Sequence, residues 1–207
     1  MPQRLTTVLF DLDGTLLPMQ QEPFIKLYFG LLAKACVPLG LAKEKLLPAV
    51  WAGTEAMVKN DGAVLNHDRF WDTFAAAMGE HVRALEPAFD RFYGGEFHGA
   101  KAAPQPTPLA AECVALLKAK GYRLILATNP LFPLVGVESR MAWAGLNPAD
   151  FERITHYGNS RYCKPNPAYY REIFELTGAD PRESLMGGND VREDLCAAQL
   201  GCGTYLV

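Results

Sequence analysis

The chain has 207 residues, a length that suits one domain with an elaboration better than two full domains. Its 20 Lys and Arg residues against 23 Asp and Glu give a formal net charge of −3, which argues against a nucleic-acid-binding protein. An apolar content of 49% with 21% charged residues excludes a disordered chain.

The composition also favours a cytoplasmic protein without a membrane anchor. The five cysteines are odd in number and contain no C-x-x-C pair, as expected for reduced thiols. The first apolar run is short and is interrupted by Asp11, so we expect no signal peptide. The longest apolar stretch, residues 24–42, contains Lys26, Lys34 and Pro38 and predicts a buried or amphipathic helix.

The first third of the chain predicts one strand followed by helices. Residues 6–10 are β-branched and apolar and stop at D-L-D-G (11–14), the pattern of a buried parallel strand and its exit loop. Between residues 18 and 99, apolar side chains recur at helical spacing and glycines separate the segments, so we expect about four helices and no strand. Residues 100–108 hold three prolines and predict a linker.

Helices and strands alternate after the linker, which predicts an α/β fold with a Rossmann-like parallel sheet and helices on both faces. The expected elements are a helix at 109–117, a strand at 122–127, a helix at 133–144, a weak strand at 153–155, a helix at 166–177, a strand at 184–187, a helix at 191–200 and a strand at 204–207. Residues 1–17 and 105–207 then form the α/β core, and residues 18–104 form an all-helical domain inserted after the first strand. The three tryptophans, Trp51, Trp71 and Trp143, are expected in the core.

Polar side chains follow the strands, and ligands of open α/β sheets bind at the carboxyl ends of strands. The side chains at these positions are Asp11 and Asp13, Thr128 and Asn129, Lys164, and Asn189, Asp190 and Asp194. Carboxylates without His or thiolate partners suit a hard cation such as Mg²⁺. A lysine and a hydroxyl beside that cation would hold a phosphate group.

These motifs resemble those of the haloacid dehalogenase-like superfamily of phosphohydrolases. D-L-D-G-T-L at residues 11–16 is similar to the first motif of that family. Thr128, Lys164 and G-N-D-x-x-x-D at 188–194 resemble the second, third and fourth motifs, in the right order. The resemblance spans residues 6–206 and implies that the inserted helices are a cap that closes over the site. It also leads us to expect hinges near residues 17–18 and 100–108.

The resemblance implies a role for each motif residue. Asp11 would be the nucleophile and a Mg²⁺ ligand. Asp13 would act as general acid and then general base, with its backbone carbonyl on the metal. Thr128 and the backbone amide of Asn129 would hold phosphate oxygens, and Lys164 would stabilise charge on Asp11 and on the transferred group.

The fourth motif departs from the family pattern. The usual spacing back from Asp194 places Asn189, not an aspartate, at the metal position, and a spacing one residue shorter places Asp190 there. An asparagine oxygen binds Mg²⁺ with one negative charge less. Both residues therefore remain candidate ligands, and Asp194 would orient Lys164 or a metal-bound water.

We therefore expect a Mg²⁺-dependent phosphohydrolase that cleaves a small phosphomonoester through an aspartyl phosphate. A phosphomutase with the same intermediate is the alternative, and a non-catalytic phospho-accepting or phospho-binding protein is a third possibility. The expected partner is a small phosphorylated metabolite, with no nucleic acid or membrane, and the expected state is a monomer or weak homodimer. The chain stops at Val207 inside a strand-like run, where members of the family usually continue.

Overall fold

Strand β1 (Thr7–Phe10) lies at the centre of a five-stranded parallel sheet in the computed structural model, which describes residues 4–207. The strand order is β3-β2-β1-β4-β5, and every neighbouring pair is parallel. The other strands are β2 (Arg123–Leu126), β3 (Arg153–Ile154), β4 (Ser184–Gly188) and β5 (Gly203–Leu206). The strands after β1 lie where the sequence predicts them.

Successive side chains of β1 point to opposite faces of the sheet. Val8 belongs to the apolar cluster that includes side chains of α5 (Pro108–Ala119) and α6 (Leu134–Trp143). Leu9 belongs to a second cluster with side chains of α7 (Pro167–Thr177). Helices therefore cover both faces, and the predicted α/β fold is confirmed.

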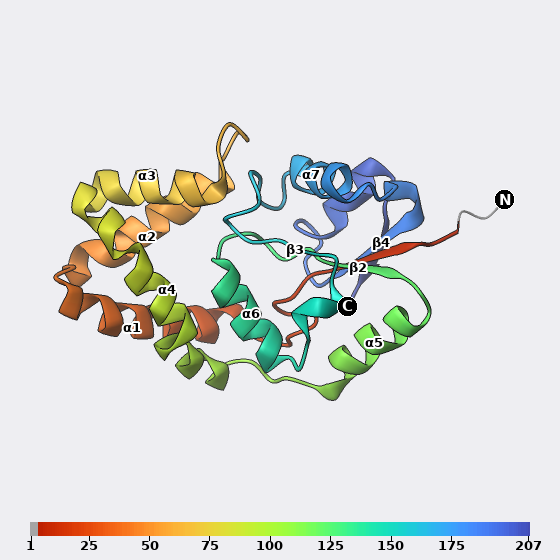
Figure 1. Cartoon of the computed structure of the whole chain (residues 1–207), viewed down its shortest axis with the longest axis horizontal. Coiled ribbons are helices and arrows are strands. Elements are labelled where there is room, and N and C mark those ends of the chain that lie inside the picture. Colours follow the sequence, from red (N-terminus) through yellow and green to blue (C-terminus); the bar gives the residue numbers. More distant parts are fainter. Residues whose placement is uncertain (1–3) are drawn as a thin grey trace.

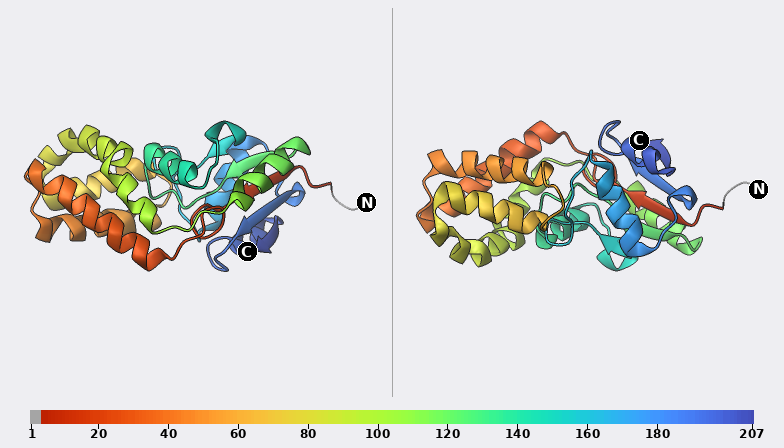
Figure 2. Two further views of the ribbon diagram at one scale, coloured as in Figure 1. Left: turned by 90° about the horizontal axis from the view of Figure 1, so that it is seen from below. Right: turned by 90° about the horizontal axis from the view of Figure 1, so that it is seen from above.

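Most residues between β1 and α5 are helical. They form α1 (Gln21–Cys36), α2 (Lys43–Val58), α3 (Asn66–Met78) and α4 (Glu86–Gly94), with 3-10 segments at Val37–Leu39, Glu80–Leu85 and Glu96–Ala102. These helices lie at one end of the molecule and the sheet at the other (Figure 1), and the views in Figure 2 agree. No strand occurs from residue 18 to residue 102, all of which the structure describes, as the sequence predicts. The domain boundaries at 17/18 and 104/105 remain a prediction.

Aromatic rings join the helical end to the α/β end. Tyr28 of α1 and Tyr93 of α4 pack against Phe132, which follows β2, with ring centroids 5.5 and 6.1 Å apart. Phe97 packs against Trp143 of α6 at 5.1 Å. All five rings belong to one apolar cluster that continues to the sheet, so the two ends share a core.

A buried asparagine adds polar contacts between the same two ends. Asn66 opens α3 and is fully buried. Its Nδ2 donates to the carbonyl of Tyr162 at 3.3 Å, and its backbone N–H donates to the carbonyl of Ser160 at 2.9 Å. Because these acceptors lie in the loop that leads to Lys164, α3 is anchored beside the predicted site.

Two local predictions are wrong. The helix expected at 191–200 is a turn followed by a 3-10 helix, Leu195–Leu200. The Asp190 carboxylate caps this turn through the backbone N–H groups of Arg192 and Glu193. The side chain of Asp194 bends back to Lys164 and to the backbone N–H of Asp190, so tertiary contacts override the helical pattern. The expected linker begins later than residue 100, because the 3-10 segment runs to Ala102 and buries Ala100 completely.

Within the part of the chain that the structure describes, no single helix is long and apolar enough to cross a membrane. Residues Gln21–Leu39 and Glu44–Val58 satisfy the length and composition criteria only as a pair, and their axes are bent by 120°.

Candidate active site

The carboxyl ends of β1, β2 and β4 open into one cavity of about 260 Å³. Seven of the eight predicted site residues line it: Asp11, Asp13, Thr128, Asn129, Asn189, Asp190 and Asp194. The eighth, Lys164, lies behind Asp11 in the loop before α7. The sheet topology thus brings together residues that are more than 180 positions apart in the sequence.

Lys164 holds two carboxylates at the base of the cavity. Its Nζ lies 2.8 Å from Oδ1 of Asp11 and 2.6 Å from Oδ1 of Asp194, and its side chain has no exposed surface. Burial opposes the charged ammonium, but Asp11 and Asp194 favour it and the pKa of Lys164 is raised well above its usual value. Burial also raises the pKa of Asp11 to about 6, against the opposing effect of Lys164.

Asp13 contacts a buried arginine that the sequence analysis missed. Arg140 of α6 is 1% exposed, forms an ion pair with Oδ2 of Asp13, and donates from Nε to the carbonyl of Gly136 at 3.1 Å. Its guanidinium lies over the ring of Phe132, 4.2 Å from the centroid. Burial raises the pKa of Asp13, while Arg140 and Lys164 act to lower it.

Two atoms of the Asp13–Arg140 pair lack a hydrogen-bond partner. Within residues 4–207, Oδ1 of Asp13 and Nη2 of Arg140 are buried without a hydrogen-bond partner. Leaving buried polar atoms unpaired costs free energy. Oδ1 of Asp13, which lines the cavity, is therefore suited to hydrogen-bond a bound ligand. The sequence gives no signal for Arg140, because it follows Glu138 and Ser139 and looks like one more polar residue of the helix.

Asn189 lies against the turn that carries the first motif. Oγ1 of Thr15 is 3.1 Å from Oδ1 of Asn189 and 3.4 Å from Oδ2 of Asp11. Gly14 has φ of +93°, and a Cβ at this position would lie 2.6 Å from Nδ2 of Asn189. The turn therefore requires glycine, and its geometry holds the Asn189 oxygen close to Asp11.

Asp190 has a different environment, although it also lines the cavity. Its Oδ1 accepts the backbone N–H groups of Arg192 at 2.7 Å and Glu193 at 2.8 Å. This carboxylate therefore caps its own turn. Its backbone N–H donates to Oδ2 of Asp194 at 3.0 Å, so the turn also fixes the carboxylate that holds Lys164.

Glu193 is a second cavity residue that the sequence analysis missed. Its carboxylate accepts from Nδ2 of Asn129 at 3.1 Å, while Oδ1 of Asn129 accepts the backbone N–H of Lys164 at 3.3 Å. Burial raises the pKa of Glu193. Asn129 thus connects the loops after β2 and β4 with the loop that carries Lys164.

The donor atoms suit a hard cation in chemistry, but the predicted ligands do not all converge. Among the described residues, no three His, Cys, Asp or Glu side chains are grouped as a metal site. The Asp190 carboxylate faces backbone amides. The Asp11 carboxylate, the backbone carbonyl of Asp13 and the side-chain carbonyl of Asn189 are oxygen donors, which Mg²⁺ prefers.

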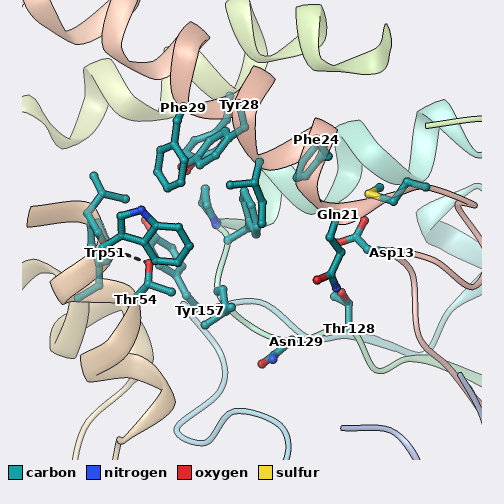
Figure 3. A pocket seen from close by; sticks show the side chains of 18 of the residues that line it. Asp13, Gln21, Phe24, Tyr28, Phe29, Trp51, Thr54, Thr128, Asn129 and Tyr157 are labelled. Atoms are coloured by element: carbon teal, nitrogen blue, oxygen red, sulfur yellow. Dashed lines mark hydrogen bonds between the residues drawn. The ribbon is translucent and has the colours of Figure 1, made fainter. Parts of the chain in front are cut away.

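The opposite wall of the cavity is aromatic, which the sequence analysis did not anticipate. Figure 3 shows Asp13, Thr128 and Asn129 on one side and Phe29, Tyr28 and Trp51 on the other. The expectation that Trp51 is a core residue is wrong, because it is 51% exposed and lines the cavity. Trp71 and Trp143 are buried as expected, and Trp71 also lines the cavity.

The family assignment rests on almost the whole chain. The model of the haloacid dehalogenase-like hydrolase family matches residues 5–201. The chain therefore belongs to the haloacid dehalogenase-like hydrolases, which confirms the resemblance of the motifs. It is an enzyme of the hydrolase class.

Similar proteins carry phosphatase names. The chain is 26% identical to the pyrophosphatase PpaX of Bacillus velezensis, over 98% of this chain and 82% of that protein. It is 29% identical to a phosphoglycolate phosphatase of Escherichia coli O157:H7, over 94% of this chain and 78% of that protein.

Solved structures share the fold. A HAD phosphatase from Thermococcus onnurineus has a TM-score of 0.62 and 20% identity, with 98% of this chain and 86% of that chain covered. The HAD hydrolase YfnB from Bacillus subtilis, solved bound to magnesium, has a TM-score of 0.60 and 18% identity, with 99% and 89% covered. At these identities the likeness establishes the architecture.

Replacing Lys164 by Met should lower the free energy of unfolding by about 3–5 kcal/mol, because Asp11 and Asp194 would stay buried without their cation. Chemical denaturation measures this change. The matched control is Lys118→Met, which removes an exposed ion pair with Asp150 and should cost about 0–1 kcal/mol. Equal losses in the two variants would contradict the structural role of Lys164.

Proposed function

We propose that the chain is a Mg²⁺-dependent phosphatase that hydrolyses a small phosphomonoester through a phosphoryl group on Asp11. The observation that carries this proposal is the Asp11 carboxylate, held through Oδ1 by buried Lys164 and set in a cavity that Thr128 and Asn129 also line. The names of the relatives, which are a pyrophosphatase and phosphoglycolate phosphatases, agree with phosphate chemistry.

Asp11 is the nucleophile in this proposal. Lys164 holds Oδ1, so Oδ2, which lies 3.4 Å from Oγ1 of Thr15, is the oxygen that attacks phosphorus. Lys164 also offsets the charge of the carboxylate as a dianionic ester approaches. Thr128 and the amide of Asn129 hold phosphate oxygens from the loop after β2.

Asp13 is the proton donor and acceptor. Burial raises the pKa of its carboxyl, which makes it easier for Asp13 to carry the proton that it donates to the leaving oxygen. The resulting carboxylate then removes a proton from the water that hydrolyses the phosphoaspartate. Arg140 holds Oδ2 of Asp13 and so fixes its orientation.

Asp11, the backbone carbonyl of Asp13 and Asn189 would hold Mg²⁺, which when bound supplies positive charge against the carboxylate and the ester. We favour Asn189 over Asp190 because Asn189 lies beside Thr15 and Asp11, whereas Asp190 is bonded to its own turn. Asp194 acts by holding Lys164.

Asp11→Asn should reduce hydrolysis of benzyl phosphate in the presence of Mg²⁺ by at least about 10³-fold, because the amide cannot act as the nucleophile. Phosphate release measures the rate, and circular dichroism checks the fold. Asp61→Asn, at an exposed surface position, is the control and should retain activity. An Asp11→Asn enzyme with wild-type activity would refute the mechanism.

Asn189→Asp should tighten Mg²⁺ binding by about tenfold, because it adds a negative charge next to Asp11. Asp190→Asn should leave the affinity almost unchanged, since its side-chain oxygen can still cap the turn. Titration calorimetry with MgCl₂ gives both dissociation constants. Weaker binding by Asp190→Asn, with no change for Asn189→Asp, would assign the ligand to Asp190 instead.

A further inference from the structure

The cavity wall that faces the carboxylates is apolar and carries no cation. It is built from α1–α4 and the loops after β2 and β3, and its rings include Phe24, Phe29, Trp51, Phe70, Phe89 and Phe132. Throughout residues 4–207, no Lys, Arg or His side chain lines the cavity. Figure 3 shows Tyr28, Phe29 and Trp51 of this wall opposite Asp13 and Thr128.

The polar groups of this wall are few and uncharged. The hydroxyl groups of Tyr28 and Tyr93 hydrogen-bond each other at 2.8 Å. Oγ1 of Thr54 donates to the carbonyl of Val50 at 2.9 Å. Burial raises the pKa of Tyr28 to about 12, so this hydroxyl stays neutral near neutral pH. Thr54 and one of the two tyrosines thus use their hydroxyl protons within the protein, and the other tyrosine keeps a neutral hydroxyl.

This chemistry disfavours a leaving group with a charge of its own. The cations near the phosphate position, Lys164 and Arg140, are paired with carboxylates. The remaining Nη2 of Arg140 is buried, and neither residue lines the cavity. A second anionic group on the substrate would lie against aromatic rings or beside Asp190 and Glu193, without a positive partner. Burying an unpaired charge is costly.

We propose that the substrate is a phosphomonoester of an uncharged, apolar alcohol or phenol of about ring size, held against the aromatic wall. This inference rests on the proposed phosphatase function. A cavity of about 150 Å³ accommodates benzene, so about 260 Å³ has room for a ring together with a phosphate group. A phosphate ester that also carries a carboxylate, such as phosphoglycolate, is a poor substrate on this account.

The test compares benzyl phosphate with 4-carboxybenzyl phosphate, in the presence of Mg²⁺. The two esters break the same kind of bond and differ by one distant charge. We expect kcat/KM to be at least about 100-fold higher for benzyl phosphate. If both esters are hydrolysed equally well, the substrate inference fails while the phosphatase function stands. If the enzyme cleaves neither ester nor phosphoglycolate, the proposed function itself fails.

Two wall variants sharpen the test. Thr54→Lys places a cation on α2 and should reduce the preference for benzyl phosphate by at least about tenfold. Trp51→Ala should lower kcat/KM for benzyl phosphate and weaken inhibition by benzylphosphonate, also by about tenfold, because it removes a ring from the wall. Trp51 is half-exposed, so this variant is expected to fold even if Thr54→Lys does not.

Val58→Ala is the matched control. Val58 lies on the same helix as Trp51, is 40% exposed and does not line the cavity. The Val58→Ala enzyme should retain the wild-type kcat/KM for benzyl phosphate and the wild-type inhibition by benzylphosphonate. Unchanged kinetics in Trp51→Ala, or equal losses in Trp51→Ala and Val58→Ala, would overturn the assignment of this wall to the substrate.

Discussion

A lysine ammonium without exposed surface is the constraint on which the site depends. Lys164 can remain charged inside the protein only because Asp11 and Asp194 lie within 2.8 Å of it. The three residues come from the end of β1, the loop before α7 and the segment after β4. This ion-pair network can therefore form only when the strands are in register and both loops have folded correctly.

The same network defines what the first carboxylate can do. With Oδ1 on Lys164, the other oxygen of Asp11 contacts Oγ1 of Thr15, and Asp11 lines the cavity. The turn after β1 then places Asp13 where Arg140 reaches it from α6. One carboxylate is thus held by a lysine and the other by an arginine, and burial raises the pKa of both. Paired carboxylates in distinct environments suit separate nucleophilic and proton-transfer roles.

The phenylalanine rings of the aromatic wall belong to the apolar cluster that joins the helices to the sheet. Phe132 illustrates this, since it packs on Tyr28 and Tyr93, lies under the Arg140 guanidinium and lines the cavity. Packing between the two ends of the molecule therefore also lowers the polarity around Asp11 and Asp13. The proposed substrate preference and the raised carboxyl pKa values would then have a common physical origin.

The sequence was sufficient to predict the sheet and the ends of its strands, because strand periodicity and the D-L-D-G pattern are local. Parallel strands then had to bring Asp11, Thr128 and Asn189 to one edge, as the structure shows. Arg140 could not be predicted, since only the packing of α6 against the first loop reveals its partner. Trp51 was misjudged for a similar reason: helical spacing shows which face is apolar but not whether that face borders a cavity.

The side-chain environments of Asn189 and Asp190 also lay beyond sequence reasoning. They depend on the Gly14 turn and on backbone amides of Arg192 and Glu193. Motif spacing alone leaves both residues as candidate metal ligands. A hydrogen-bond pattern set by two loops that are distant in sequence separates them, and it favours Asn189.

Trapping the phosphorylated enzyme tests the central claim most directly. The protein is quenched in acid during turnover of benzyl phosphate with Mg²⁺, treated with borohydride and digested, and the peptides are analysed by mass spectrometry. Reduction of an aspartyl phosphate gives homoserine, and the account predicts it at residue 11 alone. Homoserine at another aspartate, or continued hydrolysis with residue 11 unmodified throughout turnover, would contradict the account.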